Sequence, residues 1–445
     1  MKKIKNLSEG AFLKLLFAFL SLCFLVAALC MPDRNEMFSG LWKIMSGTCK
    51  ISTNYFAQGG LAATFLNMGL VCLISLLLFV VFKGTPNNVS TLAVILTIGF
   101  GSWGINVLNI WPTFFGVMIY GLVKKEKLGG LVNAMLFSTG IAPLISEMLF
   151  RYPGTEYIGF NLPGLLAALA VGFVIGFFLP AGLAHSPKVH KGFDLYSAAL
   201  PIGMTAFLLN ATLFQTMGLD VNALATAGDM SVTARSTVNI FCLVVFGLCV
   251  IAAFLLGCKP KDYWKLLSDP ALVTNFSSTY GNATFLMNVG VFGLFILGYY
   301  NLIGAPFNGV TFGIIFCMLA TCNSGSHPAN VWPIMLGYFV ASTVCGWVAP
   351  LLGGNFTLAI NAQAICVGLC FANGLSPIAD KYGWRYGVIA AVLHYLLVTS
   401  VPKLHGGFCL YNGGFTAALI CLILVPELEK FFRTKEERKL VKANK

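Results

Sequence analysis

The chain has 445 residues, of which 58% are hydrophobic and only 10% are charged, and its mean hydropathy is +0.83. Ordinary soluble domains carry about 25% charged residues, so this composition excludes a soluble protein and indicates an all-α polytopic membrane protein in a lipid bilayer. The formal net charge of +12 does not indicate nucleic-acid binding, because the basic residues gather at loop ends on one side of the predicted membrane.

The basic residues also predict the orientation of the chain. All but six of the 28 Lys and Arg residues fall at one set of loop ends, the exceptions being Arg34, Lys43, Lys50, Arg151, Arg235 and Lys403. Loops rich in Lys and Arg stay in the cytoplasm. We therefore expect a multi-pass protein of the cytoplasmic membrane whose N-terminus and C-terminus are both cytoplasmic.

Apolar segments, taken in chain order, predict ten membrane crossings. A helix needs about 20 apolar residues to cross the hydrocarbon core. The first segment follows a basic start, and its length favours a retained helix over a cleaved signal peptide. The predicted crossings are Ala11–Met31, Gly60–Phe82, Leu128–Phe150 (kinked at Gly140–Pro143), Leu162–Ala184, Phe193–Phe214, Ser236–Cys258, Gly281–Tyr299, Leu358–Ala379, Tyr386–Ser400 and Phe408–Val425.

Two broken elements interrupt this series. Residues 101–112 read GSWGINVLNIWP and lie between apolar segments that are too short to cross the membrane. Residues 322–333 read CNSGSHPANVWP and repeat the pattern 221 positions later. Non-helical backbone at membrane depth is tolerated only inside protein or beside a water-filled cavity. We therefore predict re-entrant broken-helix hairpins at 89–123 and 310–346.

The two hairpins belong to an internal duplication. Asn67 and Asn288 are also 221 positions apart, STGIAPL (138–144) and ANGLSPI (372–378) are 234 apart, and KVHKGFDLY (188–196) and KLHGGFCLY (403–411) are 215 apart. The spacing between equivalent residues of the two halves increases from 221 to 234. This increase places 13 additional residues of the second half around Tyr338–Phe356. The predicted domains are repeat A (1–235), repeat B (236–427) and a basic cytoplasmic tail (428–445).

The number of crossings fixes how the repeats are related. Gly60–Phe82 runs inward, whereas its counterpart Gly281–Tyr299 starts after the cytoplasmic sequence KPKDYWK and runs outward. We therefore expect two inverted-topology repeats, each of about five crossings and one hairpin, around a pseudo-two-fold axis in the membrane plane.

The hairpins carry the predicted substrate-binding residues. An Asn before each Trp–Pro pair is expected to cap the following helix, with Pro in its first turn, so that two helix N-termini point into the protein. Structural packing of the hairpins is the alternative, and for Asn67 and Asn288 the alternative is bonding to the hairpin backbone. The predicted set is Asn67, Asn288, Ser102, Asn106, Asn109, Trp111, Ser326, His327, Asn330 and Trp332.

A second set is predicted to form a gate or an interface between the repeats. The repeated HxGFxLY motif and the two Gly–Pro breaks supply it: His190, Tyr196, His405, Tyr411, Gly140, Pro143, Gly374 and Pro377. Interfacial anchoring by the tyrosines is the alternative to gating or to a proton-linked role of the histidines. Asp194 stands opposite Cys409, so that carboxylate is not shared by the repeats. Glu147 and Arg151 are spaced as an i, i+4 ion pair.

Motifs of enzymes and metal sites are not found. The sequence holds no GxSxG, HExxH or Walker loop, and its fourteen cysteines show no CxxC pair, which favours buried, reduced packing residues. We therefore expect neither an enzyme nor a metal or other cofactor.

The sequences NIWP and KLHGGFCLYNGGF resemble a family of prokaryotic multi-pass membrane proteins of unknown function. The order of five crossings and one hairpin per half resembles the architecture of urea transporters, in topology only. That resemblance implies a central pathway at the repeat interface and a homo-oligomer, by analogy a trimer.

Two functions remain open from the sequence. The first is a transporter or channel-like facilitator of a small polar, uncharged solute, with its pathway at the inverted-repeat interface. The second is an ion-coupled secondary transporter of a small anion or metabolite. The scarcity of ionisable residues in the predicted crossings favours the first.

Overall fold

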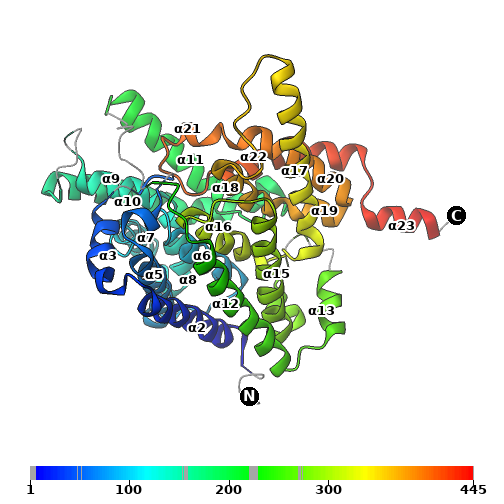
Figure 1. The fold of residues 1–445 in the computed structure, drawn as a ribbon, viewed down its shortest axis with the longest axis horizontal. Helices are drawn as coiled ribbons and strands as arrows, with labels where there is room; N and C mark the ends of the chain where they lie inside the picture. Colours follow the sequence, from blue (N-terminus) through cyan, green and yellow to red (C-terminus); the bar gives the residue numbers. More distant parts are fainter. Residues whose placement is uncertain are drawn as a thin grey trace.

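The computed structural model describes residues 7–47, 49–51, 53–152, 154, 159–219, 229–268, 272 and 274–443. Within these residues every regular element is a helix. Figure 1 shows the chain from α2 to the C-terminal helix α23. The first half forms α2 (Glu9–Cys30), α3 (Met37–Ser46), α4 (Tyr55–Gln58), α5 (Leu61–Val81), α6 (Asn88–Phe100), α7 (Trp111–Lys124), α8 (Leu128–Ser138), α9 (Ala142–Phe150), α10 (Leu162–His190) and α11 (Ala199–Asn210).

The second half repeats this order. It forms α12 (Arg235–Leu255), α13 (Pro260–Leu267), α14 (Phe276–Tyr280), α15 (Asn282–Leu302), α16 (Gly309–Leu319), α17 (Pro328–Leu351), α18 (Gln363–Ala372), α19 (Ser376–Tyr382), α20 (Trp384–Val398), α21 (Val401–Leu404), α22 (Asn412–Phe431) and α23 (Lys435–Ala443).

Among the described residues, seven helical segments are long and apolar enough to cross a membrane: α2, α5, α8 together with α9, α10, α12, α15 and α17. The protein is therefore a helical membrane protein. The kink predicted at Gly140–Pro143 is confirmed as a 3₁₀ turn, Thr139–Ile141, between α8 and α9. The equivalent turn, Asn373–Leu375, separates α18 from α19.

Asparagine side chains begin several helices, and they do so at equivalent places in both halves. Asn87 caps α6 and Asn308 caps α16, while Asn54 caps α4 and Asn275 caps α14. Each pair is 221 positions apart. A capping oxygen satisfies a backbone N–H group that has no partner inside the helix. The repeated asparagines therefore fix the same helix starts twice.

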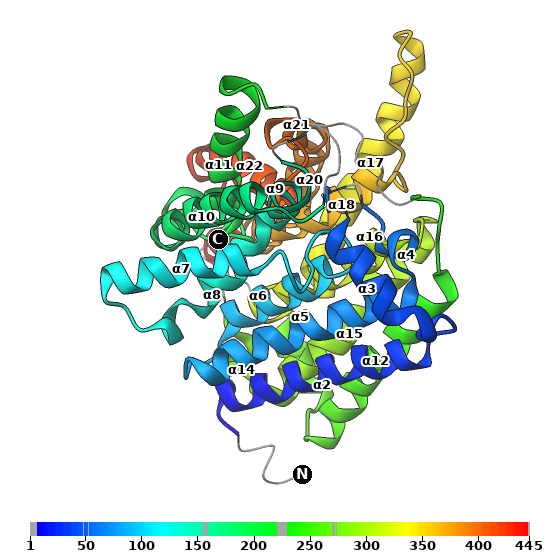
Figure 2. The ribbon, with the colours of Figure 1, turned by 90° about the vertical axis from the view of Figure 1, so that its left-hand side faces the viewer.

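The halves also pack in the same way. α2 packs on α5 as α12 packs on α15, and α7 packs on α10 as α17 packs on α20. Figure 2 shows α2, α5, α15 and α12 as one layer, with α7, α10, α11 and α22 on the other side of α6.

The short helices α6 and α16 cross at the centre of the molecule (Figure 1). The Cys317 thiol lies 4.0 Å from the Leu96 carbonyl oxygen, and these two residues are 221 positions apart. Gly99 and Gly313 allow the contact, because a Cβ atom on Gly313 would lie 2.3 Å from the Gly99 carbonyl oxygen. The two predicted hairpins therefore meet through equivalent segments.

Several predicted boundaries differ from the structure. α17 runs to Leu351, beyond the predicted hairpin end at 346, and its 24 residues are enough to cross a membrane. Its last turns project from the body in Figure 2, in the region where the sequence predicts the extra residues. The helices of the crossings predicted to start at Phe193 and Phe408 begin only at Ala199 and Asn412, because loops made largely of turns precede them.

Candidate functional site

Asn67 and Asn288 hydrogen-bond to the breaks between α6 and α7 and between α16 and α17. The Asn67 amide nitrogen donates to the carbonyl oxygens of Gly101 and Ile105 at 2.7 and 2.8 Å, and its oxygen accepts from the Val107 amide at 3.2 Å. Asn288 donates in the same way to Cys322 and Ser326 at 2.8 and 2.9 Å. Both side chains are fully buried. Both residues therefore bond to the backbone of the predicted hairpins, which is the alternative to substrate binding.

The oxygen of Asn288 has a different partner from that of Asn67. The position equivalent to Val107 is Pro328, which has no backbone N–H group. The hydroxyl of Tyr263, on the short helix α13, donates to the Asn288 oxygen instead, at 3.2 Å. A side chain from outside the hairpin thus replaces the missing backbone donor.

Asn109 and Asn330 do not cap the following helices in the way that the sequence predicts. The N-cap of α7 is Ile110, without a side-chain bond, and the N-cap of α17 is His327. Each asparagine instead accepts a bond from the backbone N–H three residues earlier, from Asn106 at 2.9 Å and from His327 at 3.0 Å. Trp111–Pro112 does open α7, but Pro333 lies inside α17, because α17 starts five residues earlier at Pro328.

The amide nitrogens of these asparagines join each break to the next helix pair. Asn109 donates to the Gly104 carbonyl oxygen and to the Ser146 hydroxyl, each at 3.0 Å. Asn330 donates to the Gly325 carbonyl oxygen at 2.8 Å and to the Asp380 carboxylate at 2.6 Å. Ser146 and Asp380 are equivalent positions, 234 apart.

The remaining predicted substrate-binding residues also lie in or beside the breaks. Ser102 donates to the Gly309 carbonyl oxygen at 2.8 Å, and the Ser326 hydroxyl lies 3.4 Å from that of Ser376. The Trp111 indole donates to the Val107 carbonyl oxygen at 2.9 Å, whereas Trp332 is 41% exposed and lies beside Trp384. Their contacts account for packing of the breaks, and substrate binding by them stays a prediction.

The HxGFxLY segments, by contrast, lie between the two halves. Each forms a non-helical loop and bonds to the Gly–Pro break of the other half. The Leu195 amide donates to the Gly374 carbonyl oxygen at 3.0 Å, and the Leu410 amide donates to the Gly140 carbonyl oxygen at 2.8 Å. The structure therefore brings together the predicted interface residues of both repeats.

Beside these loops lie two cavities of similar volume. The first cavity, about 420 Å³, is lined by Asn88, Val89, Leu92, Asn133, Phe137, Leu183, Pro187, His190, Gly192, Asp194, Leu195, Ser197, Ala198 and Ser324. The second cavity, about 400 Å³, is lined by Ile51, Trp103, Met230, Gln363, Ala364, Val367, Gly368, Val398, Thr399, Pro402, Leu410, Asn412 and Gly413. Of the predicted site residues, only His190 lines either of them.

The two cavities are lined by equivalent positions. Seven pairs match at the three repeat spacings: Leu183 and Val398, Pro187 and Pro402, Leu195 and Leu410, Ser197 and Asn412, Ala198 and Gly413, Asn133 and Val367, Ser324 and Trp103. The first cavity reaches the N-terminal turn of α6, at Asn88 and Leu92, whereas the second reaches Trp103, just beyond its C-terminal end. The 13 residues of α6 separate them by about 20 Å.

Buried aromatic side chains connect the two loops that line the cavities. Phe371 lies 5.1 Å from Tyr196 and 6.2 Å from both Tyr411 and Phe100, measured between ring centroids. All four rings are at most 1% exposed. We call these four residues the aromatic plug. The plug joins the Tyr196 loop of the first cavity to the Tyr411 loop of the second.

Polar groups sit within this plug. The Tyr196 hydroxyl donates to the carbonyl oxygens of Cys317 and Cys370 at 2.8 and 3.2 Å. The Asn373 amide donates to the Met318 carbonyl oxygen at 3.0 Å and to the Thr321 hydroxyl at 2.7 Å, and its oxygen has no hydrogen-bond partner. An unsatisfied buried amide oxygen is costly, so Asn373 holds acceptor capacity that packing does not use.

The histidines of the two loops differ in their hydrogen bonds. His190 Nδ1 accepts from the backbone N–H groups of Gly192 and Asp194 at 3.2 and 3.4 Å. Its Nε2 must then carry the proton and donates to the Ser197 hydroxyl at 2.8 Å. His405 Nδ1 instead bonds to the Asn412 oxygen.

Other ionisable groups have structural partners. Glu147 and Arg151 form the predicted ion pair at 3.1 Å. His394 lies between the Tyr338 hydroxyl at 2.6 Å and the Gly413 carbonyl oxygen at 2.8 Å. All fourteen cysteines are free, and among the described residues no three His, Cys, Asp or Glu side chains gather as metal ligands.

Sequence reasoning set Asp194 aside because the repeats do not share it, and it missed Asn373 and Asp380. Asn373 and Asp380 lie in or just after the ANGLSPI segment, which the duplication marks. Each replaces a hydroxyl residue of the first half, Thr139 and Ser146 respectively. A comparison of the polar residues that differ between the repeats would have found them.

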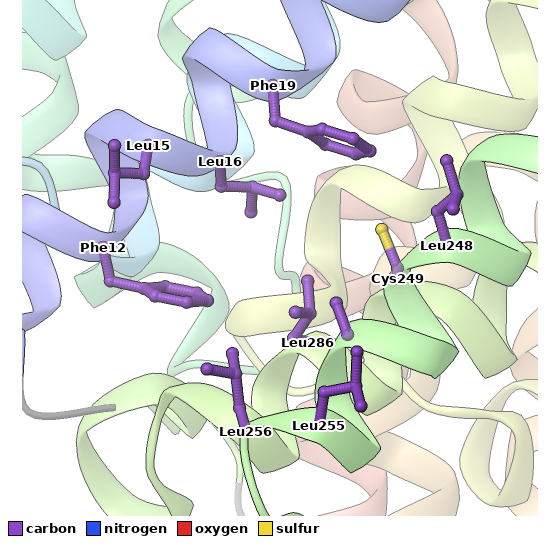
Figure 3. A pocket seen from close by; sticks show the side chains of 10 residues that line it. Phe12, Leu15, Leu16, Phe19, Leu248, Cys249, Leu255, Leu256 and Leu286 are labelled. Carbon is purple, nitrogen blue, oxygen red and sulfur yellow. The ribbon is translucent and has the colours of Figure 1, made fainter. Parts of the chain in front are cut away.

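A third cavity, of about 340 Å³, lies between α2, α12 and α15 (Figure 3). Its lining is apolar and includes Phe12, Leu16, Leu248 and Leu286. A polar solute finds no hydrogen-bond partner there. This groove lies between helices of membrane-spanning length, so it does not compete with the first and second cavities as a solute site.

Residues 33–215 and 259–430 match the family described as proteins of unknown function, DUF1576. The chain belongs to the DUF1576 family. The matched segments contain every residue that lines the first and second cavities except Met230. The paired cavities are therefore built from the part of the chain that defines a DUF1576 protein. No curated protein and no solved structure matches the chain.

Proposed function

We propose that this DUF1576 protein is a membrane transporter, or channel-like facilitator, of a small polar and uncharged solute. The observation that carries the proposal is the pair of cavities, which are lined by equivalent residues and lie at opposite ends of α6. Internal repeats of opposite topology place their substrate pathway at the repeat interface. Here the two loops and the aromatic plug occupy that interface.

The arrangement of charges supports an inverted orientation of the repeats. The first cavity is lined by the segment that follows Lys188 and Lys191, on the lysine-rich side of the chain. The second cavity is reached by Ile51 and Met230, which belong to loops of the lysine-poor side. The first cavity then opens to the cytoplasm and the second to the outside.

The chemistry of the linings supports a neutral solute. Amides and hydroxyls supply most of the polar groups, from Asn88, Asn133 and Ser197 in the first cavity and from Gln363, Thr399 and Asn412 in the second. Among the described residues that line the two cavities, Asp194 is the one carboxylate and none is Lys or Arg. A few placed hydrogen-bonding groups in an apolar wall suit a small polar molecule. For the solute to pass between the two loops, the plug must open, because its rings join them.

Flux into proteoliposomes tests the proposal directly. Purified protein is reconstituted, and the vesicles are mixed with hyperosmotic urea, glycerol or an amino-acid amide while light scattering records their re-swelling. We expect faster re-swelling than in protein-free vesicles for at least one of these probes, and slower re-swelling after Asn373→Leu. Equal rates with and without the protein for a broad panel of neutral solutes would refute the facilitator.

The positions of the cavities give a second prediction. In a Cys30→Ala background, which removes the exposed native thiol, a thiol is introduced by Val89→Cys in the first cavity or by Ala364→Cys in the second; both side chains are exposed in this structure. We expect a membrane-impermeant maleimide to label Val89→Cys only from the cytoplasmic side and Ala364→Cys only from the outside. Labelling of both from the same side would contradict the inverted arrangement.

A further inference from the structure

One group in the first cavity is out of place in a neutral pathway. Asp194 is 1% exposed, lines the cavity, and has no counterpart carboxylate, because Cys409 stands at the equivalent position of the second cavity's loop. The two loops otherwise share His, Gly, Phe, Leu and Tyr. The carboxylate is therefore present in the first repeat only, within a loop that the two repeats otherwise share.

The bonds of Asp194 leave half of the carboxyl group unused. Its Oδ1 accepts from the Tyr196 backbone N–H at 2.9 Å, whereas its Oδ2 is buried and has no hydrogen-bond partner among the described residues. Gly374 leaves room for Oδ1, since a Cβ atom there would lie 2.7 Å away. A buried carboxylate with one hydrogen bond and no cation is strongly disfavoured against its neutral acid.

Among the described residues, no cation is paired with the Asp194 carboxyl group to keep it ionised. The titratable side chains around it are His190 from the end of α10, Tyr196 of the same loop and Cys421 of α22. His190 is neutral, because its Nδ1 accepts from two backbone N–H groups. Two charged groups lie farther along the neighbouring elements. Lys381 of α19 lies over the ring of Phe193, and Lys191 forms an exposed ion pair with Glu429 of α22.

We infer that Asp194 is a proton-binding residue of the first cavity. A hydronium ion in the cavity transfers one proton to Oδ2. One O–H bond of the hydronium ion breaks, one O–H bond forms at Oδ2, and a water molecule remains. The neutral acid is then the form that packs against Gly374. Ionisation requires water at Oδ2, and hence an opening of the loop that bonds Leu195 to Gly374.

This binding gives the proposed transporter a proton-linked step. Loss of the proton to the cytoplasm and opening of the first cavity are one event, and uptake of the proton accompanies its closure. That coupling rests on the proposed function, whereas proton binding by Asp194 does not. Coupling between Asp194 protonation and cavity opening favours proton-coupled transport over a pathway that is open at all pH values.

Infrared spectroscopy of the purified protein in lipid nanodiscs tests the proton site without any solute. A pH titration is followed at the C=O stretch of protonated carboxylic acids. We expect a band at neutral pH that disappears at alkaline pH and that is missing in both Asp194→Asn and Asp194→Cys, the second of which copies the other repeat. Loss of the band in either folded variant supports the assignment.

Asp380→Asn is the matched control. Asp380 accepts from Asn330 and interacts with Lys435, so it is expected to be ionised and its removal should leave the band unchanged. A wild-type spectrum without a protonated-carboxyl band at neutral pH would overturn the inference. So would a band that persists in both Asp194 variants. Absence of flux in proteoliposomes, with the band present, would instead refute the proposed function and leave the proton site standing.

Discussion

Asn67→Leu is expected to destabilise the protein by about 3 kcal/mol or more and to abolish any flux. The substitution keeps the approximate size of the side chain but removes two donors and one acceptor. It leaves the carbonyl oxygens of Gly101 and Ile105 and the amide of Val107 without partners in a buried site. Each unsatisfied buried group costs about 1–3 kcal/mol. Lipid cannot replace the lost bonds, because it offers no hydrogen-bond donors or acceptors.

The measurement is the fraction of monodisperse protein that remains after heating in detergent, followed by size-exclusion chromatography. Asn133→Val is the matched control, because the Asn133 oxygen has no hydrogen-bond partner and Val367 stands at the equivalent position. Tyr263→Phe removes only the hydroxyl that serves Asn288 and should cost about 1 kcal/mol. An Asn67→Leu protein as stable as Asn133→Val would contradict the role of this amide in the break.

Much of the fold could be predicted from the sequence, because the residues that break helices are few and repeated. Gly140–Pro143 and its counterpart Gly374–Pro377 correspond to the 3₁₀ turns, and the spacing change from 221 to 234 corresponds to the extra length of α17. Proline and glycine act on their own backbone, so their effect can be read locally. The segments that they separate then appear at equivalent places.

The candidate site could not be predicted in the same way. Asn109 and Asn330 resemble helix caps next to Trp–Pro, but their partners are a backbone N–H three residues earlier and a side chain 37 or 50 residues later. α17 starts at Pro328 with His327 as its N-cap. The sequence prediction instead places this start at the Trp–Pro pair, five residues later. Partners that are distant in the sequence determine whether the hydrogen-bonding groups of a polar residue are already paired within the protein or remain available to a ligand.

The loops after His190 and His405 show the same limit. Their sequences GFDLY and GFCLY are apolar enough to continue a helix, and a predicted crossing begins within each of them. They are not helical in the structure, and each bonds across the interface to a glycine of the other half, at Gly374 and Gly140. Tertiary contacts override local propensity here. The cavities, which exist because these loops leave their helices, therefore had no local signal.

Gly313→Ala is expected to have an effect of comparable size at the point where the halves cross. An added Cβ atom would lie 2.3 Å from the Gly99 carbonyl oxygen and 2.5 Å from both the Ser102 hydroxyl and the Trp103 ring. The backbone oxygen cannot rotate away as a side chain can, so α6 and α16 must move apart. Overpacking of this kind costs about 1–3 kcal/mol, and the movement also displaces Trp103 from the lining of the second cavity.

Gly298→Ala separates this clash from the general effect of replacing a helical glycine. Gly298 lies in α15, and a Cβ atom added to it would meet nothing within 4 Å, so its replacement by Ala should stabilise the helix by about 0.5–1 kcal/mol. The difference between the two variants, measured by the same heating assay, isolates the contact between Gly99 and Gly313. Because the crossing is where equivalent segments of the two halves touch, a lower stability of Gly313→Ala together with altered labelling of Ala364→Cys would tie the cavity to the crossing. A Gly313→Ala protein as stable as Gly298→Ala would show that the two hairpins are not in contact there.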